Sequence, residues 1–327
     1  MDFRLWAPKA TTVEIALANR RIPIMPCAGG WWIVDVPATG PETEYSFILD
    51  NSPPLPDPRS ACQPHGVHGP SRVIDHQAFA WTDERWQPGP LSSAMLYELH
   101  IGTFTPAGTF EAAIEHLDHL VERGITHVEL LPVAEFPGVR GWGYDGVDLY
   151  APHHAYGGSE GLKRLVNTAH SKGLAVLLDV VYNHLGPAGN YLERFGPYFT
   201  TRHHTPWGQA VNLDGPGSEE VRRFFCDNAL MWLRDYHVDG LRLDAVHALI
   251  DTSAVHFLEH LAAEVQVLEA QLGRHVVLIA ESDLNDPRIV RPPEIGGYGL
   301  AAQWSDDFHH GIARPPRIAT RKAVITT

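Results

Sequence analysis

A guanidinium and a carboxylate stand two residues apart in the segment GLRLDAVH, residues 240–247. The alternation of Leu241 and Leu243 with Arg242 and Asp244 predicts a strand on which both charged side chains point the same way. Charges near a core are costly unless they are paired or take part in chemistry. Taken alone, the pair is interpreted more readily as a structural ion pair than as part of an active site.

Two further predicted strands also end in polar residues. Residues 178–184 read LDVVYNH and include Asp179, and residues 279–283 read IAESD and include Glu281. The carboxyl ends of strands meet on one face of a β/α barrel, so Asp244 and Glu281 are predicted to form a pair. Paired carboxylates suit glycosidic bond cleavage: one attacks or stabilises the sugar cation, and the other protonates the leaving oxygen.

Several other side chains are candidates to support such a site. Arg242 would keep its neighbouring carboxylate ionised, and His184 and His247 could hydrogen-bond sugar hydroxyls. The loop GWGYDGVDLYAP, residues 141–152, carries Trp142 and Tyr144, whose rings could stack on a sugar. Such rings often do no more than pack a loop down, but together with three polar strand ends they favour a sugar-binding site.

The elements that must position these residues alternate between strand and helix from about residue 93. No Gly-x-Gly-x-x-Gly follows the first strand, so polar strand ends favour a TIM-type barrel over a dinucleotide-binding sheet. The barrel is expected to be incomplete, with about six of the usual eight strands. Strands are predicted at residues 95–102, 127–133, 174–182, 240–247, 276–282 and 301–306, and helices at 111–123, 159–172, 218–236 (capped by Ser218) and 253–272.

The first 90 residues show a different pattern, in which short alternating runs are separated by Gly and Pro clusters. Runs at residues 2–7, 12–17, 31–36 and 44–49 predict a small, immunoglobulin-like β-sandwich. The segment QPGP at 87–90 resembles a linker. We therefore expect a carbohydrate-binding-like sandwich at 1–90, a catalytic barrel at 91–310 and an atypical basic tail at 311–327.

Composition narrows the classes of partner. The 327 residues carry a formal net charge of −14, which argues against nucleic acid and fits a neutral ligand. No apolar run approaches the length of a membrane span, and the N-terminus MDFRLWAPKA lacks the pattern of a signal peptide. A cytoplasmic protein without membrane contact is the expectation, and the sequence predicts no oligomeric state.

Metal and cofactor sites are not predicted. The pairs His153-His154, His203-His204 and His309-His310 have no carboxylate or further histidine at ligand-like spacing, and neither HExxH nor CxxC occurs. Asn183 is interpreted as a loop hydrogen-bonding residue. The three cysteines lie far apart and suggest no disulfide framework.

Three segments in order resemble the signature regions of the α-amylase superfamily of retaining glycoside hydrolases and transglycosidases. They are DVVYNH at 179–184, GLRLDAVH at 240–247 and IAESD at 279–283, and the resemblance extends from the start of the chain to about residue 310. It implies a double displacement in which Asp244 is the nucleophile and Glu281 the general acid/base. The resemblance also implies that Tyr144, Asp179, His184 and Arg242 surround the sugar at the cleavage point.

Longer segments refine this resemblance. Residues 96–110, 128–158, 205–215 and 279–288 most resemble the superfamily members that hydrolyse maltooligosyl trehalose, releasing trehalose from the chain end. WSDDFHH at 304–310 also fits these hydrolases. Residues 3–17 resemble the N-terminal domain of these hydrolases and of glucan branching enzymes, which are the alternative. Either resemblance implies an α-glucan substrate.

The sequence departs from the superfamily after His310. The fourth signature region, which supplies a third carboxylate, has no counterpart in GIARPPRIATRKAVITT at 311–327. We therefore expect a chain truncated at its C-terminus, in which the last barrel strands are absent. Two hypotheses follow: the chain has the hydrolase chemistry, or it is an inactive fragment that at most binds glucan.

Overall fold

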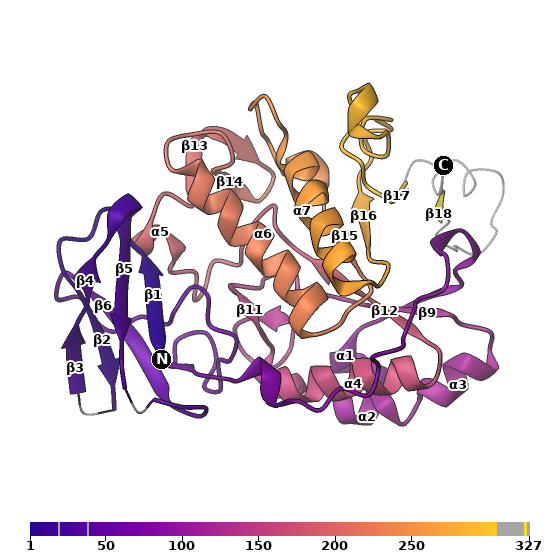
Figure 1. Ribbon diagram of the computed structural model, residues 1–327, viewed down its shortest axis with the longest axis horizontal. Helices are drawn as coiled ribbons and strands as arrows, with labels where there is room; N and C mark the ends of the chain where they lie inside the picture. The colour runs from indigo at the N-terminus through magenta and orange to yellow at the C-terminus, as the bar shows by residue number, and fades with distance from the viewer. Residues whose placement is uncertain (19, 38, 306–323, 326–327) are drawn as a thin grey trace.

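A computed structural model describes residues 1–18, 20–37, 39–305 and 324–325 (Figure 1). Its centre is a curled sheet of six parallel strands, flanked at one end by the antiparallel β18 (Val324–Ile325). Each parallel strand lies inside a segment predicted from the sequence, with shorter ends. In spatial order the six are β8 (Leu96–Leu99), β9 (His127–Leu130), β12 (Ala175–Val180), β15 (Gly240–Leu243), β16 (Val277–Glu281) and β17 (Ala302–Trp304).

The middle strands of this sheet are buried on both faces. Every residue of β9, β12 and β15 is buried, as expected for parallel strands that helices cover. Gly240 permits the close approach of its neighbours, because a Cβ there would lie 2.6 Å from the carbonyl oxygen of Val277. One face of the sheet carries a small apolar cluster of its own, made of Leu177, Val277, Ile279, Ala302 and Trp304.

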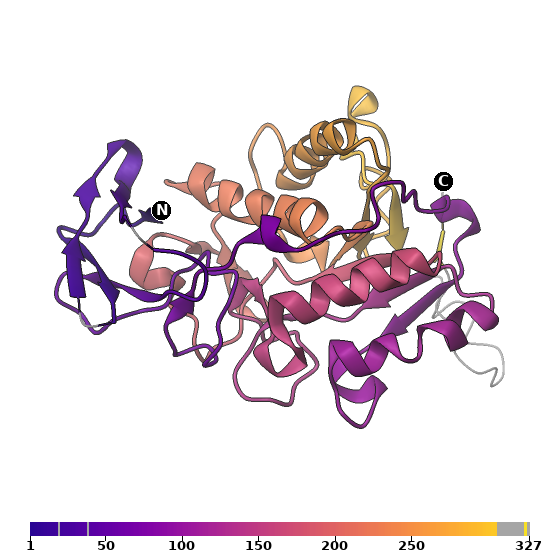
Figure 2. The same cartoon turned by 60° about the horizontal axis from the view of Figure 1, so that its bottom comes forward.

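Helices run alongside the strands (Figure 2), and α6 and α7 pack against each other. The helix predicted at 111–123 is broken at Glu115 and His116 into α2 and α3. The helices are α1 (Ile101–Phe104), α2 (Phe110–Ile114), α3 (Leu117–Glu122), α4 (Gly158–Ser171), α5 (Leu192–Phe195), α6 (Ser218–Asp235) and α7 (Phe257–Leu272). Short 3₁₀ helices are η1 (Ala28–Gly30), η2 (His76–Ala78), η3 (Leu91–Ser93), η4 (His154–Tyr156), η5 (Val246–Ala248) and η6 (Pro293–Ile295).

One predicted helix cap and one predicted helix start were wrong. Ser218 is the first residue of α6 and not its cap: Gly217 precedes it in the left-handed conformation, with no side-chain cap. Helix α7 begins at Phe257 instead of residue 253, because the His256 ring accepts a hydrogen bond from the N–H of Leu258 and acts as the cap. A histidine cap is outside the usual set of Ser, Thr, Asp and Asn, so the sequence pattern did not reveal it.

Residues 1–72 form two antiparallel sheets at the far end of the molecule from β17 (Figures 1 and 2). The four predicted runs are strands, and three short strands were missed. One sheet contains β1 (Asp2–Trp6), β5 (Trp31–Asp35) and β4 (Met25–Pro26), and the other contains β3 (Arg20–Pro23), β2 (Val13–Leu17), β6 (Glu44–Leu49) and β7 (Ser71–Arg72).

The two parts of the chain share one apolar core. Polar contacts join them as well: Trp31 Nε1 donates to Glu220 Oε1 at 3.0 Å, and Arg59 Nη1 donates to Asp227 Oδ2 at 2.8 Å. Among the described residues, no helix is both long and apolar enough to cross a membrane.

Two hairpins follow the carboxyl ends of the central strands. After β9 the chain forms β10 (Ala134–Glu135) and β11 (Asp148–Pro152), which enclose the loop that carries Trp142 and Tyr144. After β12 it forms β13 (Phe199–Thr205) and β14 (Gly208–Val211). Both hairpins therefore leave the same edge of the sheet, the edge at which the polar strand ends gather.

Candidate active site

Arg242, on β15, is the centre of a cluster of three carboxylates. Its Nη1 donates to both Asp179 oxygens at 3.0 and 2.9 Å and to Asp244 Oδ1 at 2.7 Å. Its Nη2 lies 3.7 Å from Glu281 Oε2. One guanidinium thus gathers side chains from three neighbouring strands and brings the two predicted catalytic carboxylates to the same place.

The register of the sheet explains this convergence. Asp179 on β12 is paired directly with Arg242 on β15, and β16 runs parallel on the other side of β15. Side chains alternate along a strand, so Asp179 and Glu281 share the face of Leu177 and Ile279. The polar site is therefore the continuation of the small apolar cluster toward the carboxyl ends of the strands.

Burial separates the cluster into two kinds of group. The side chains of Asp179 and Arg242 are 1% and 8% exposed, whereas those of Asp244 and Glu281 are 12% and 15% exposed. Asp244 and Glu281 are therefore the more accessible pair, and Asp179 and Arg242 are the more deeply buried, supporting pair.

The protonation of the supporting pair is governed by opposing effects. Burial raises the pKa of Asp179 to about 7, while Arg242 and the hydroxyl of Tyr144 (2.9 Å) oppose that rise. Burial disfavours the charged guanidinium, but Asp179 and then Asp244 outweigh it and raise the pKa of Arg242. Arg242 therefore stays a cation and favours the ionised form of Asp179.

The second oxygen of Asp244 is held by Asn183. Asn183 Nδ2 donates to Asp244 Oδ2 at 3.1 Å, and its Oδ1 lies 2.5 Å from Nδ1 of His184. Asn183 is fully buried, so the plain loop role expected from the sequence understates it. Burial lowers the pKa of His184, so the neutral ring can donate from Nδ1 to the amide oxygen.

Trp207, in the turn between β13 and β14, was not predicted to belong to the site. Its ring stacks on His184, with centroids 5.0 Å apart and planes 6° apart, and it is 47% exposed. The available signal was a tryptophan in the turn-like sequence TPWG, which is weak without a known partner. The structure adds a second aromatic surface near the predicted sugar site.

Glu281 is oriented by the backbone that follows Asp244. The N–H of Ala245 donates to Glu281 Oε2 at 2.8 Å. Ala245 has φ 42° and ψ 53°, the left-handed region, which costs an alanine about 1–2 kcal/mol. The strained backbone after β15 turns the chain, so that the residue following Asp244 donates a hydrogen bond to Glu281.

Two predicted substrate-binding residues lie apart from the carboxylates. His247 is exposed, and within the described part of the chain it has no hydrogen bond to the cluster. Trp142 is 61% exposed, and its ring lies 4.7 Å from that of His100. With Arg140 and Tyr156 these rings line a separate surface depression of about 710 Å³.

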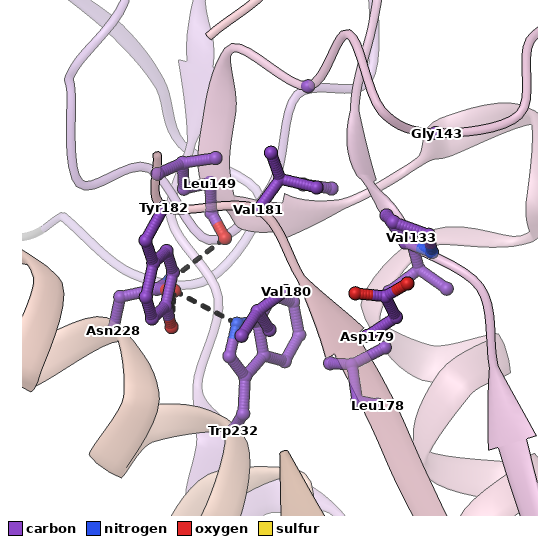
Figure 3. A pocket seen from close by; sticks show the side chains of 13 residues that line it. Val133, Gly143, Leu149, Leu178, Asp179, Val180, Val181, Tyr182, Asn228 and Trp232 are labelled. Carbon is purple, nitrogen blue, oxygen red and sulfur yellow. Dashed lines mark hydrogen bonds between the residues drawn. The ribbon is translucent and has the colours of Figure 1, made fainter. Parts of the chain in front are cut away.

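A small cavity behind Asp179 is not the binding site. It measures about 10 Å³, room for roughly one water. Figure 3 shows its apolar walls, including Leu149, Val180 and Trp232, with the amide of Asn228 at one side. Asp179 lines this cavity, and its two carboxylate oxygens accept hydrogen bonds from Arg242.

Part of the sequence prediction falls outside the described residues. These are Asp307 and His309, the end of the strand predicted at 301–306, and all of the 311–327 tail except the backbone of β18.

Known proteins resemble this chain over nearly its whole length. Residues 74–205 match the model of the alpha amylase catalytic domain. Proteins named malto-oligosyltrehalose trehalohydrolase are 52% identical over 314 residues in Arthrobacter ramosus and 49% identical over 313 residues in Saccharolobus solfataricus, covering 95% of this chain. The matches cover 55% and 54% of those relatives, so the chain spans about half the length of the curated relatives it matches.

More distant matches agree with the fold. A 1,4-alpha-glucan branching enzyme from Mycobacterium bovis is 30% identical over 356 residues, covering 95% of this chain and 48% of that protein. A crystal structure of a Salmonella typhimurium protein is 41% identical, with a TM-score of 0.89, and the match covers 95% of this chain and 53% of that one.

Proposed function

Because the chain carries an alpha-amylase catalytic domain and is homologous over 95% of its length to proteins named malto-oligosyltrehalose trehalohydrolase, we propose that it acts on the same substrate. The reaction is hydrolysis of the α-1,4 bond next to the terminal trehalose unit of maltooligosyl trehalose. The observation that carries this proposal is the pair of accessible carboxylates, Asp244 and Glu281, held against one buried guanidinium.

The mechanism we propose is a double displacement. Asp244 attacks the anomeric carbon while Glu281 protonates the departing oxygen, and a glycosyl ester forms on Asp244. Water then attacks that carbon, with Glu281 now acting as the base. Contacts from Arg242 and Asn183 to its two oxygens support the nucleophile role, because they hold the Asp244 carboxyl group in one orientation beside a cation.

The substrate contacts are also proposals. Tyr144 and His184 flank the carboxylates, through Asp179 and Asn183 respectively, and we place the ring of the cleaved sugar against them. Trp142 and His247 lie farther from the two carboxylates, where we expect them to contact sugar units beyond the cleaved bond. Branching enzyme is the less favoured activity, because its identity of 30% is well below the 52% of the trehalohydrolases.

We extend the proposal to the architecture. The six parallel strands correspond to part of a (β/α)₈ barrel, and the two antiparallel sheets to an immunoglobulin-like sandwich that contacts glucan. The domain boundary was placed at residue 90. We now propose a boundary nearer residue 74, because Asp83 bonds to His170 and Trp86 to Asp239, both in the catalytic part.

The test is an assay of trehalose release from maltooligosyl trehalose by the folded 327-residue chain. Release that is lost in Asp244→Asn and in Glu281→Gln, but kept in Asp283→Asn, supports the proposal. Asp283 is the matched control because it is exposed and two residues from Glu281. Formation of branched glucan instead of trehalose would contradict the proposal and indicate branching activity. Glucan binding without turnover would show that this chain only binds.

A further inference from the structure

The base of the β10–β11 hairpin brings together one carboxylate and two imidazoles. Glu135 Oε1 lies 2.8 Å from Nδ1 of His154 and 3.1 Å from Nδ1 of His153. The three ligand-type atoms all lie within 4.8 Å of one another. Glu135 and His153 are fully buried, and His154 is 31% exposed, so the cluster has one side open to solvent.

Hydrogen bonds within the protein satisfy two members of this cluster but not the third. Glu135 Oε2 accepts from the backbone N–H of His154 at 2.8 Å, and Oε1 is hydrogen-bonded to Nδ1 of His154 at 2.8 Å. Neither ring nitrogen of His153 has a hydrogen-bond partner among the described residues, and its contact with Oε1 lacks hydrogen-bond geometry. A neutral imidazole has one donor and one acceptor nitrogen, so a buried ring without partners needs another explanation.

The orientation of His153 is fixed by its neighbours. Its ring stacks on Phe136, with centroids 3.9 Å apart, and meets the ring of Tyr156 edge-on at 4.7 Å. These contacts hold Nδ1 toward Glu135. The ring therefore points into the cluster without gaining a hydrogen bond there.

We propose that Glu135, His153 and His154 bind a divalent transition-metal ion, with Zn²⁺ as the first candidate. Two imidazoles and a carboxylate are a ligand set that such ions prefer. Ligand atoms about 2.0–2.2 Å from one tetrahedral ion lie about 3.4 Å apart, so the N···O contacts of 2.8 and 3.1 Å would each widen by a few tenths of an ångström when the ion binds. The carboxylate would offset one of the ion's two charges, and the Nδ1 of His153 would gain its missing partner.

No sequence pattern marks this site, because its ligands are separated along the chain. Glu135 stands 18 positions before His153, outside any ligand spacing of a single helix or loop, and only the pairing of β10 with β11 unites them. The bound ion would close the ends of the loop 136–147. That loop carries Tyr144, whose hydroxyl donates to Asp179, so the ion would act by positioning Tyr144 and not by touching substrate.

The experiment measures Zn²⁺ binding by the full chain after it has been stripped with a chelator. We expect one Zn²⁺ per chain by elemental analysis, a rise in Tm on adding Zn²⁺, and a visible d–d absorption spectrum when Co²⁺ replaces it. His154→Ala and Glu135→Gln should each lose all three signals. Because His154 is partly exposed, its replacement also tests the site if the Glu135 variant fails to fold.

His203→Ala is the matched control, since His203 also belongs to a pair of adjacent histidines and contacts a carboxylate, Asp214, at 3.0 Å. It should keep the ion. Wild-type protein that binds no Zn²⁺ at stoichiometric concentration, or His154→Ala that binds as much as wild type, would overturn the proposal.

Discussion

Arg242 shows how much of the site depends on one side chain. It contacts Asp179, Asp244 and Glu281 while its own side chain is only 8% exposed. Removing its charge would leave buried carboxylates without a partner, which is more costly than losing a surface ion pair. The planar guanidinium is also needed, because it offers separate nitrogens to different carboxylates.

Arg242→Lys should therefore be strongly deleterious. A lysine ammonium cannot reach all three carboxylates, so we expect stability to fall by about 3 kcal/mol and turnover by roughly 100-fold or more. Urea unfolding and the trehalose assay measure the two effects. Arg234→Lys is the control, because that arginine pairs with Asp235 while 53% exposed and should change stability by less than about 0.5 kcal/mol. Equal effects of the two substitutions would refute the argument.

The site was predictable where its residues sit in one strand-end motif. Arg242 and Glu281 lie at the ends of parallel strands and Asp244 directly follows one, and parallel strands must bring such ends together. Asn183 and Trp207 were undervalued or missed because their roles come from partners 61 and 23 positions away, Asp244 and His184. His247 lies in the right motif but is turned to solvent by η5.

Helix α6 is tied to the sheet by one buried amide, as Figure 3 shows. Asn228 accepts from Tyr182 at 2.6 Å and from Trp232 at 3.1 Å, and it donates to the carbonyl of Leu149 at 2.8 Å. These contacts span α6, the end of β12 and β11. The amide has no access to solvent that could replace any of them.

Asn228→Leu should destabilise the protein by about 3 kcal/mol or more, because three buried polar groups lose their partner. Urea unfolding followed by circular dichroism measures this change. Asn167→Leu on α4 is the comparison: its amide oxygen accepts only from the N–H and hydroxyl of Thr82, near solvent, so the loss should be about 1 kcal/mol. A smaller effect at Asn228 than at Asn167 would contradict this account of α6.

The 3₁₀ helix η2 carries a histidine, His76, whose burial should make the folded protein less stable in acid. Burial, followed by the charge of Lys163, lowers the pKa of His76 to about 4, and its buried Nδ1 has no hydrogen-bond partner in the described part of the chain. In the unfolded chain a histidine titrates near 6.5. Between these values the unfolded chain binds a proton that the folded chain does not, so stability falls as the pH falls.

We expect the free energy of unfolding to decline between about pH 6.5 and 4, with His76 contributing on the order of 2 kcal/mol to that decline. His76→Gln should reduce the slope, whereas replacement of the exposed His119 by Gln should not. Urea titrations at several pH values give the slopes. An unchanged slope in His76→Gln would show that this ring takes up its proton in the folded state.

At the scale of elements, the alternation of strands and helices decided what the sequence could predict. The six parallel strands were found because they alternate with helices along the chain. Strands β4 and β7 have two residues each and exist only through their partners β5 and β6, so no local pattern marks them. The break between α2 and α3 could not be predicted either, because the helical periodicity of apolar residues continues through it.

For the molecule as a whole, the ends of the sheet matter most. In the described part of the chain β8 has a neighbour on one side only, β9. Tyr97 on β8 is 39% exposed, and Met95 just before it is 57% exposed. An edge strand with unpaired backbone groups and exposed apolar side chains favours pairing with a strand of another chain.

The isolated 327-residue chain should therefore self-associate at micromolar concentrations, as light scattering after gel filtration would show. Tyr97→Lys places a charge on the free strand and should reduce the mass. Val267→Lys on α7 is the control, since Val267 is 60% exposed but remote from the sheet edge. A monomer at all concentrations would mean that β8 is covered in solution.

The uneven charge around Arg242 has a practical consequence for ligands. Asp244 and Glu281 are the more accessible groups beside this one cation, so a protonated amine at the position of the sugar ring would meet two carboxyl groups. Such a field rewards positive charge at the ring far more than it rewards the neutral sugar. Ring-shaped amines of glucose size should thus compete with substrate in their protonated form, lose potency as alkali neutralises them, and offer a route to selective inhibitors.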